Sequence, residues 1–160
     1  MTTWSAAERP DLSFSLVPEV EVPPGVASDD LESLAAFVLA AEGATGVWEI
    51  TVALVDDARL QSLHREFMGI DTPTDIMTFP VDNSAGGAQG GELAISVDHA
   101  MTQGIAWGHS PEEEAAFLVV HGLLHLTGWR DDTDQQRQCM LARQHELIDQ
   151  WRQQLTGESS

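Results

Sequence analysis

Two histidines lie four residues apart in VVHGLLHLTGWRDD, the stretch at 119–132. On a helix this spacing puts His121 and His125 on one face, where two imidazoles can bind one metal ion. The surrounding residues are almost all apolar, which predicts a buried helix and requires polar partners for both rings. Gly128 is typical of a helix end, after which the chain can fold back. Asp131 is therefore the expected third ligand.

Two imidazoles and one carboxylate match the ligand set of open catalytic zinc sites, in which water completes the coordination. Asp132 is the alternative carboxylate, and Cys139 is expected to be a core or boundary residue rather than a fourth ligand. Gly122 stands where the HExxH motif of zinc peptidases carries its glutamate base. The competing interpretation is a pair of ordinary core histidines. The combined pattern favours one Zn²⁺ per chain, bound by a helix without a built-in base.

The hydrophobic pattern and the capping residues predict the elements that hold this site. Ser110 as N-cap, Pro111 after it and three glutamates in the first turn indicate where the histidine-bearing helix begins. Pro18 suggests that the first strand is an edge strand or is interrupted. We expect strands at 12–22, 47–57, 74–82 and 92–97, and helices at 28–43, 57–69, 98–107, 111–127 and 133–155.

This order predicts a single α+β domain, with helices packed on a mixed four-stranded sheet and the metal site at the end of a buried central helix. The domain is expected to span 1–155 and to be followed by a disordered tail at 156–160. The glycine-rich stretch 83–91 is interpreted as a hairpin connection, because no helix follows it as a phosphate cradle would require. Phe67 is expected to point into the core.

The composition indicates a soluble cytoplasmic protein. No apolar run approaches the roughly 20 residues of a membrane span, and the first residues do not resemble a signal peptide. The single cysteine fits a reducing compartment. The formal net charge is −19, with 26 acidic residues, seven arginines and no lysine. This charge alone argues against nucleic-acid binding, unless the acidic surface is an adaptation to a salt-rich cytoplasm.

Three blocks form a specific pattern: HGLLHLTGW at 121–129, PTDIMTFP at 73–80 and GGELAIS at 90–96. In this order they resemble the motifs H-G-x-L-H-L-x-G-Y, P-T-D-V-L-S-F-P and G-D-I-x-I-S of the YbeY family of single-domain, metal-dependent bacterial endoribonucleases. The resemblance implies a zinc-dependent single-strand endoribonuclease that acts in ribosomal RNA maturation, at the 3′ end of 16S rRNA, and in ribosome quality control. It implies ribosomal RNA and the small ribosomal subunit as partners, with neither membrane nor DNA.

Two positions differ from the commonest pattern of that family. The third ligand is usually a histidine at the position of Asp131, but one branch has aspartate in a stretch similar to KDKTDED, which RDDTDQQ resembles. The family usually has a phosphate-serving arginine where Met68 stands and an asparagine where His64 stands. Arg65, one helical turn before Met68, is the expected replacement. The alternative is that Arg65 is an ordinary surface residue.

The expected catalytic residues are thus Arg65, Glu92 and His121. The metal would polarise a phosphoryl oxygen, and Arg65 would stabilise the charge of the transition state, with Arg59 and Arg130 as weaker candidates. The base is left open between a metal-bound hydroxide and Glu92. Two other functions compete: a metal-dependent hydrolase of a small molecule or peptide, and a non-catalytic ribosome-assembly factor with a structural metal.

Overall fold

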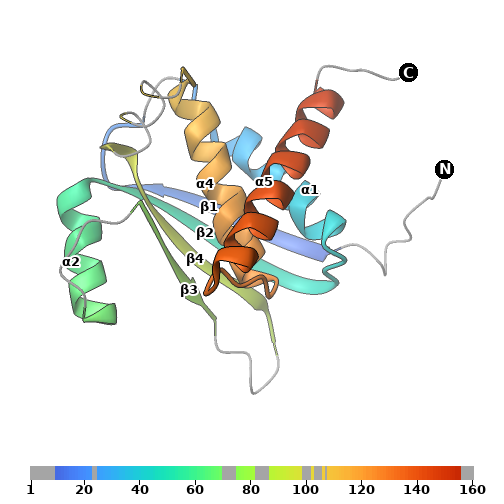
Figure 1. Cartoon of the computed structure of the whole chain (residues 1–160), viewed down its shortest axis with the longest axis horizontal. Helices are drawn as coiled ribbons and strands as arrows, with labels where there is room; N and C mark the ends of the chain where they lie inside the picture. The colour runs from blue at the N-terminus through green and yellow to red at the C-terminus, as the bar shows by residue number, and fades with distance from the viewer. Residues whose placement is uncertain are drawn as a thin grey trace.

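The computed structural model describes residues 10–22, 25–69, 75–81, 87–98 and 108–155, together with positions 102 and 106. Its elements follow the chain in the expected order (Figure 1): β1 (Pro10–Pro18), α1 (Ser28–Ala41), β2 (Gly46–Val55), α2 (Asp57–Met68), β3 (Ile76–Pro80), β4 (Gln89–Ser96), α4 (Pro111–Leu126) and α5 (Asp134–Leu155). The expected tail at 156–160, most of the helix expected at 98–107 and most of the hairpin expected at 83–91 lie outside the described residues.

The four strands form one mixed sheet in the order β1-β2-β4-β3. β1 pairs with β2 and β2 with β4 in parallel, whereas β3 pairs with β4 in the antiparallel direction. β1 is an edge strand that ends at Pro18, as the sequence indicated, because a proline cannot donate a ladder hydrogen bond. The α+β fold with a mixed four-stranded sheet is therefore confirmed.

Helices cover both faces of this sheet. α1, α4 and α5 pack together on one face, and α2 lies on the other (Figure 1). The alternation of side chains along each strand separates two clusters: Leu93 and Ile95 of β4 belong to the large core under α4, whereas Ala94 faces α2. None of the described helices has the length and apolarity needed to cross a bilayer. The sheet thus gives α4 a wide apolar surface on which to lie.

α4 begins where the sequence predicts. The Ser110 hydroxyl accepts from the backbone N–H of Glu113, and the Glu113 carboxylate accepts from the backbone N–H of Ser110, which is a complete capping box. The latter bond lowers the pKa of Glu113. Pro111 occupies the first turn, where its missing N–H has no cost. The start of the histidine-bearing helix is fixed by local chemistry.

One predicted core residue is wrong. Phe67 is 61% exposed, and its ring meets the ring of Phe79 edge-on at 5.4 Å between centroids. α2 packs on the sheet through Leu63 and Leu60, one and two turns earlier, so the end of this short helix leaves Phe67 at the surface.

Candidate metal centre

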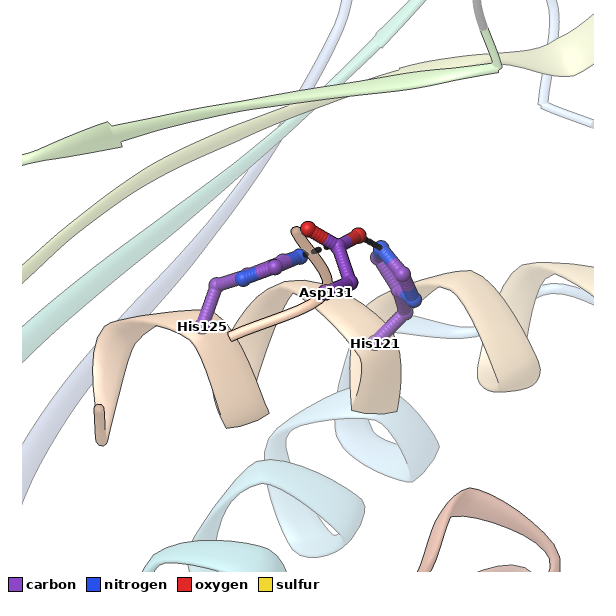
Figure 2. Close-up of side chains that lie close together, drawn as sticks. All are labelled: His121, His125 and Asp131. Carbon is purple, nitrogen blue, oxygen red and sulfur yellow. Dashed lines mark hydrogen bonds and ion pairs between the residues drawn. The ribbon is translucent and has the colours of Figure 1, made fainter. Parts of the chain in front are cut away.

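α4 and the loop after it bring the three expected ligands together (Figure 2). The rings of His121 and His125 lie side by side, with centroids 4.7 Å apart and planes at 78°. α4 ends at Leu126, and Gly128 has a φ of 111°, a left-handed conformation that suits glycine and turns the chain back. The Asp131 carboxylate then lies between the two rings, with its Oδ2 3.2 Å from His125 Nε2 and 3.9 Å from His121 Nε2.

The remaining nitrogen of each ring has its own partner. His125 Nδ1 lies 3.1 Å from the backbone carbonyl of Trp129, which can only accept, so Nδ1 carries the hydrogen. His121 Nδ1 lies 3.3 Å from Oε1 of Gln144, whose amide nitrogen donates to the Phe117 carbonyl. His121 Nδ1 is therefore a donor as well. Both histidines are therefore held in the tautomer in which Nδ1 carries the hydrogen and Nε2 has an available lone pair. This arrangement is typical of metal-ligating imidazoles.

Three electron-pair donors consequently face one another without a hydrogen between them. They are the two Nε2 atoms and Asp131 Oδ2, and one ligand atom from each of the three residues lies within 4.8 Å of the others. Such a cluster requires positive charge, either a proton on an imidazole or a cation. Burial lowers the pKa of His121, which disfavours the protonated ring. The donor set fits a divalent ion, because two imidazoles and a carboxylate are the ligands of open zinc sites.

The loop that carries Asp131 is fixed from behind by a chain of hydrogen bonds. Trp129, whose carbonyl orients His125, donates from its indole Nε1 to Oε1 of Glu42 at 2.6 Å. Oε2 of Glu42 accepts from Nε of Arg143 at 2.7 Å, so α1, the loop and α5 are joined around one nearly buried carboxylate. The geometry of the cluster therefore depends on α4 and α5, which are consecutive in the chain, and on the end of α1, which is distant in the sequence.

Gly122 explains why the helix has no built-in base. A Cβ at this position would lie 2.5 Å from Cδ2 of Leu93 and 3.1 Å from Cδ1 of Ile76, because this side of α4 lies against the sheet. A glutamate there would point into the core and not toward the histidines. The absence of the peptidase glutamate is thus a packing requirement of this fold.

Two grooves meet at the cluster, and His121, Asp131 and Asp75 line both. One groove, of about 390 Å³, runs between α4 and α5. The other, of about 530 Å³, runs along β3 and is also lined by His64 and Met68 from α2. Because the cluster lies where they join, an extended chain in the grooves would pass over the three residues that could hold a metal ion.

Comparison with known proteins agrees with this arrangement. The model of the family described as Endoribonuclease YbeY matches residues 19–152. The chain belongs to the YbeY family. An endoribonuclease YbeY of Moorella thermoacetica is 39% identical over 119 residues, which are 68% of this chain and 76% of that protein. One from Pelotomaculum thermopropionicum is 37% identical over 117 residues, 69% of this chain and 77% of that protein.

A solved structure shares the fold of this YbeY chain. The solution structure of TM1509 from Thermotoga maritima superimposes with a TM-score of 0.59 and covers 92% of this chain and 94% of that chain. The two sequences are 22% identical, so the likeness concerns the architecture alone. It agrees with the sheet and helix arrangement of Figure 1.

The structure does not bring the other expected site residues of this YbeY chain to the cluster. Glu92 has the strand parity of Ala94, so its exposed side chain belongs to the α2 face, across the sheet from His121. Arg65 is exposed on α2 and lines neither groove, whereas its neighbours His64 and Met68 line the groove along β3.

Asp132, the alternative carboxylate, and Cys139 also lie apart from the cluster. Asp132 is paired with Arg130 at the surface, which leaves Asp131 as the carboxylate between the histidines. Cys139, expected at a core or boundary position, is exposed because it lies on the solvent side of α5.

Two residues at the centre were missed by sequence reasoning. Gln144 is buried, with 3% of its surface exposed, and the sequence held a signal for it: it follows Met140 by four residues and precedes Leu147 by three, so it lies within the apolar stripe of α5. A polar residue in such a stripe needs a partner, here His121. Asp75 had no role assigned from the sequence, where it is part of the block PTDIMTFP, but it lines both grooves beside His121.

Proposed function

We propose that this chain is a zinc-dependent endoribonuclease that cleaves single-stranded RNA during maturation of the 3′ end of 16S rRNA and in ribosome quality control. The observation that carries the proposal is the convergence of His121 Nε2, His125 Nε2 and Asp131 Oδ2 at the junction of two grooves. The names of the relatives support RNA as the substrate. The partners would be ribosomal RNA and the small ribosomal subunit, and the location would be the cytoplasm.

In this proposal His121, His125 and Asp131 hold the ion. When bound, a zinc ion supplies Lewis acidity toward a phosphoryl oxygen and activates water. Gln144 and the Trp129 carbonyl hold the two rings with Nε2 toward the ion. Asp131 makes the centre less positive than three histidines would. The grooves on either side bind the RNA strand so that the scissile phosphate lies over the ligands.

The decisive experiment removes two ligands separately. His121→Ala and Asp131→Ala should each abolish cleavage of a single-stranded RNA in the presence of zinc, with an unchanged circular dichroism spectrum. Asp149→Ala, an exposed carboxylate change on α5, is the matched control and should cleave as the wild type does. Cleavage retained in both ligand variants would contradict the proposal.

The acidic composition keeps two alternatives in the test. A hydrolase of small molecules would show RNA affinity with little dependence on salt, whereas contacts to phosphates make the affinity fall steeply as salt rises. A structural metal would have a closed coordination sphere and exchange slowly, whereas a catalytic ion keeps an open position. Metal analysis of the purified protein, followed by exchange of the bound ion and a salt series of RNA binding, separates the three functions.

A further inference from the structure

Positive charge near the metal centre is scarce. The chain has seven arginines and no lysine. Among the described residues that line the two grooves, Arg137 is the one arginine, whereas Asp75 and Asp131 both contribute carboxylates. Three other arginines line neither groove and pair with carboxylates elsewhere: Arg59 with Glu19, Arg143 with Glu42 and Arg152 with Glu113. A polyanion entering the grooves therefore meets a cationic side chain at Arg137.

Arg137 is tied to the loop that supplies the third ligand. Its Nη1 donates to the backbone carbonyl of Asp131 at 3.1 Å, and its Nη2 pairs with Asp134, one turn earlier on α5. The side chain of Asp134 is 90% exposed and that of Arg137 is 54% exposed, so water screens this pair strongly. A phosphate can replace Asp134 at little cost, because a guanidinium binds phosphate through two parallel hydrogen bonds.

The walls of the groove suit a nucleobase. The apolar part of the lining comes from Phe117, Leu118, Met140 and Leu141. Leu141 is 46% exposed at this surface although it is a large aliphatic residue. The volume of about 390 Å³ lies within the ~300–1,000 Å³ range of small-molecule pockets. Apolar and aromatic surface beside a cation is the combination that binds single-stranded nucleic acid.

We propose that Arg137 binds the RNA phosphate adjacent to the metal centre, and that the groove between α4 and α5 receives the nucleotide attached to that phosphate. This inference rests on the proposed endoribonuclease function and assigns to Arg137 the role expected of Arg65. Arg137 binds the substrate directly. Its hydrogen bond to the Asp131 carbonyl holds the guanidinium beside the metal site, where the groove between α4 and α5 begins.

The test compares two ion-paired arginines of α5. Binding of a fluorescein-labelled oligouridine to the zinc-loaded protein is measured by anisotropy over a salt series, together with kcat and KM for cleavage. Arg137→Ala should weaken binding about tenfold and reduce the slope of log affinity against log salt by about 0.7, the value for one single-strand phosphate contact. Arg152→Ala, whose partner Glu113 lies at the other end of α4, should leave both quantities unchanged. Leu141→Asp, a change at an exposed position of the same groove, should weaken binding by charge repulsion.

Zinc affinity provides the readout that separates substrate binding from support of Asp131. If Arg137→Ala weakens zinc binding but keeps the wild-type salt slope, Arg137 only positions the ligand loop and the inference is overturned. If the wild-type protein cleaves RNA but Arg137→Ala and Arg152→Ala show equal slopes of log affinity against log salt, this inference alone is overturned. A zinc-loaded wild type that neither binds nor cleaves RNA overturns the proposed function as well.

Discussion

The chemistry of the centre is decided by which atom of each histidine carries a hydrogen. His121 and His125 have different partners, a side-chain amide and a backbone carbonyl, yet both partners accept from Nδ1 and leave the lone pair of Nε2 available to a metal ion. A backbone carbonyl cannot be removed by substitution, but the amide can. Gln144 is therefore the residue at which the supporting hydrogen bond can be tested directly.

Gln144→Ala should weaken zinc binding by about 10–100-fold, the usual cost of losing a hydrogen bond behind a ligating histidine. The ring of His121 would lose its fixed tautomer, while the ligand atoms themselves stay in place. Zinc affinity is measured by competition with a chromophoric chelator. Gln138→Ala, on the exposed side of the same helix, is the control and should bind zinc as the wild type does. Equal affinities for the two variants would show that Gln144 only fills space.

Strand parity makes a second prediction at the residue scale. Glu92→Gln should keep RNA cleavage within about twofold, because the side chain belongs to the α2 face of the sheet. Asp75→Asn should lower cleavage at least tenfold, since this carboxylate lines both grooves beside His121. Single-turnover cleavage by zinc-loaded variants measures both. A large loss in Glu92→Gln would show that its carboxylate reaches the metal centre.

At the scale of elements, α4 combines two tasks on neighbouring sides, because residues 121 and 122 are about 100° apart around a helix. One side presents the histidines to the grooves, and the other packs Gly122 against Leu93 and Ile76 of the sheet. The glycine allows the helix to approach the strands closely, and this approach sets how far the rings lie from β3 and Asp75. The metal site is therefore coupled to the packing of the sheet.

Gly122→Ala tests this coupling. Replacing an unconstrained helical glycine by alanine raises the free energy of unfolding by about 1 kcal/mol. Here the new Cβ would lie 2.5 Å from the fully buried Leu93, and this overpacking should lower the free energy of unfolding by about 1–3 kcal/mol. The expected net result is a lower free energy of unfolding in urea, accompanied by weaker zinc binding. Ala36→Gly on the exposed face of α1 calibrates the propensity term. A variant that is stabilised by about 1 kcal/mol would show that α4 has room against the sheet.

The sequence predicts the elements, and the three residues that converge at the cluster, well where the signal is local. Ser110, Pro111 and Glu113 mark the start of α4. The spacing of His121, His125 and Asp131 marks the residues that could hold a metal ion. The order β1-β2-β4-β3 depends on contacts between distant segments, so it has no local signal.

The faces of the sheet could not be assigned without that order. The parity of Glu92 was readable, but only the assembled sheet shows that its face is the one opposite α4. For the same reason, the sequence could not show that Arg65 lies outside the grooves and that Arg137 lines one of them. Their places relative to the grooves follow from how α2 and α5 pack, which no short stretch encodes.

At the scale of the whole molecule, the net charge of −19 opposes both folding and RNA binding. Repulsion among 26 acidic residues, with seven arginines to offset it, destabilises the compact state at low ionic strength. Arg137 gives the grooves a local cation, but RNA must still approach an acidic surface. Salt should therefore raise the stability of the fold and lower the affinity for RNA.

If the acidic, lysine-free surface is an adaptation to a salt-rich cytoplasm, the thermal unfolding midpoint should rise as KCl is increased from about 0.05 M to about 2 M. Over this range the Debye length falls to about 3 Å or less, so repulsion between surface carboxylates is largely screened. A parallel series in sucrose controls for solute exclusion, which stabilises proteins regardless of their charge. In the same KCl series the affinity for RNA should fall, because contacts to phosphates are screened as well. An unfolding midpoint indifferent to molar KCl would contradict the adaptation, since self-repulsion would then be too small to have shaped the surface.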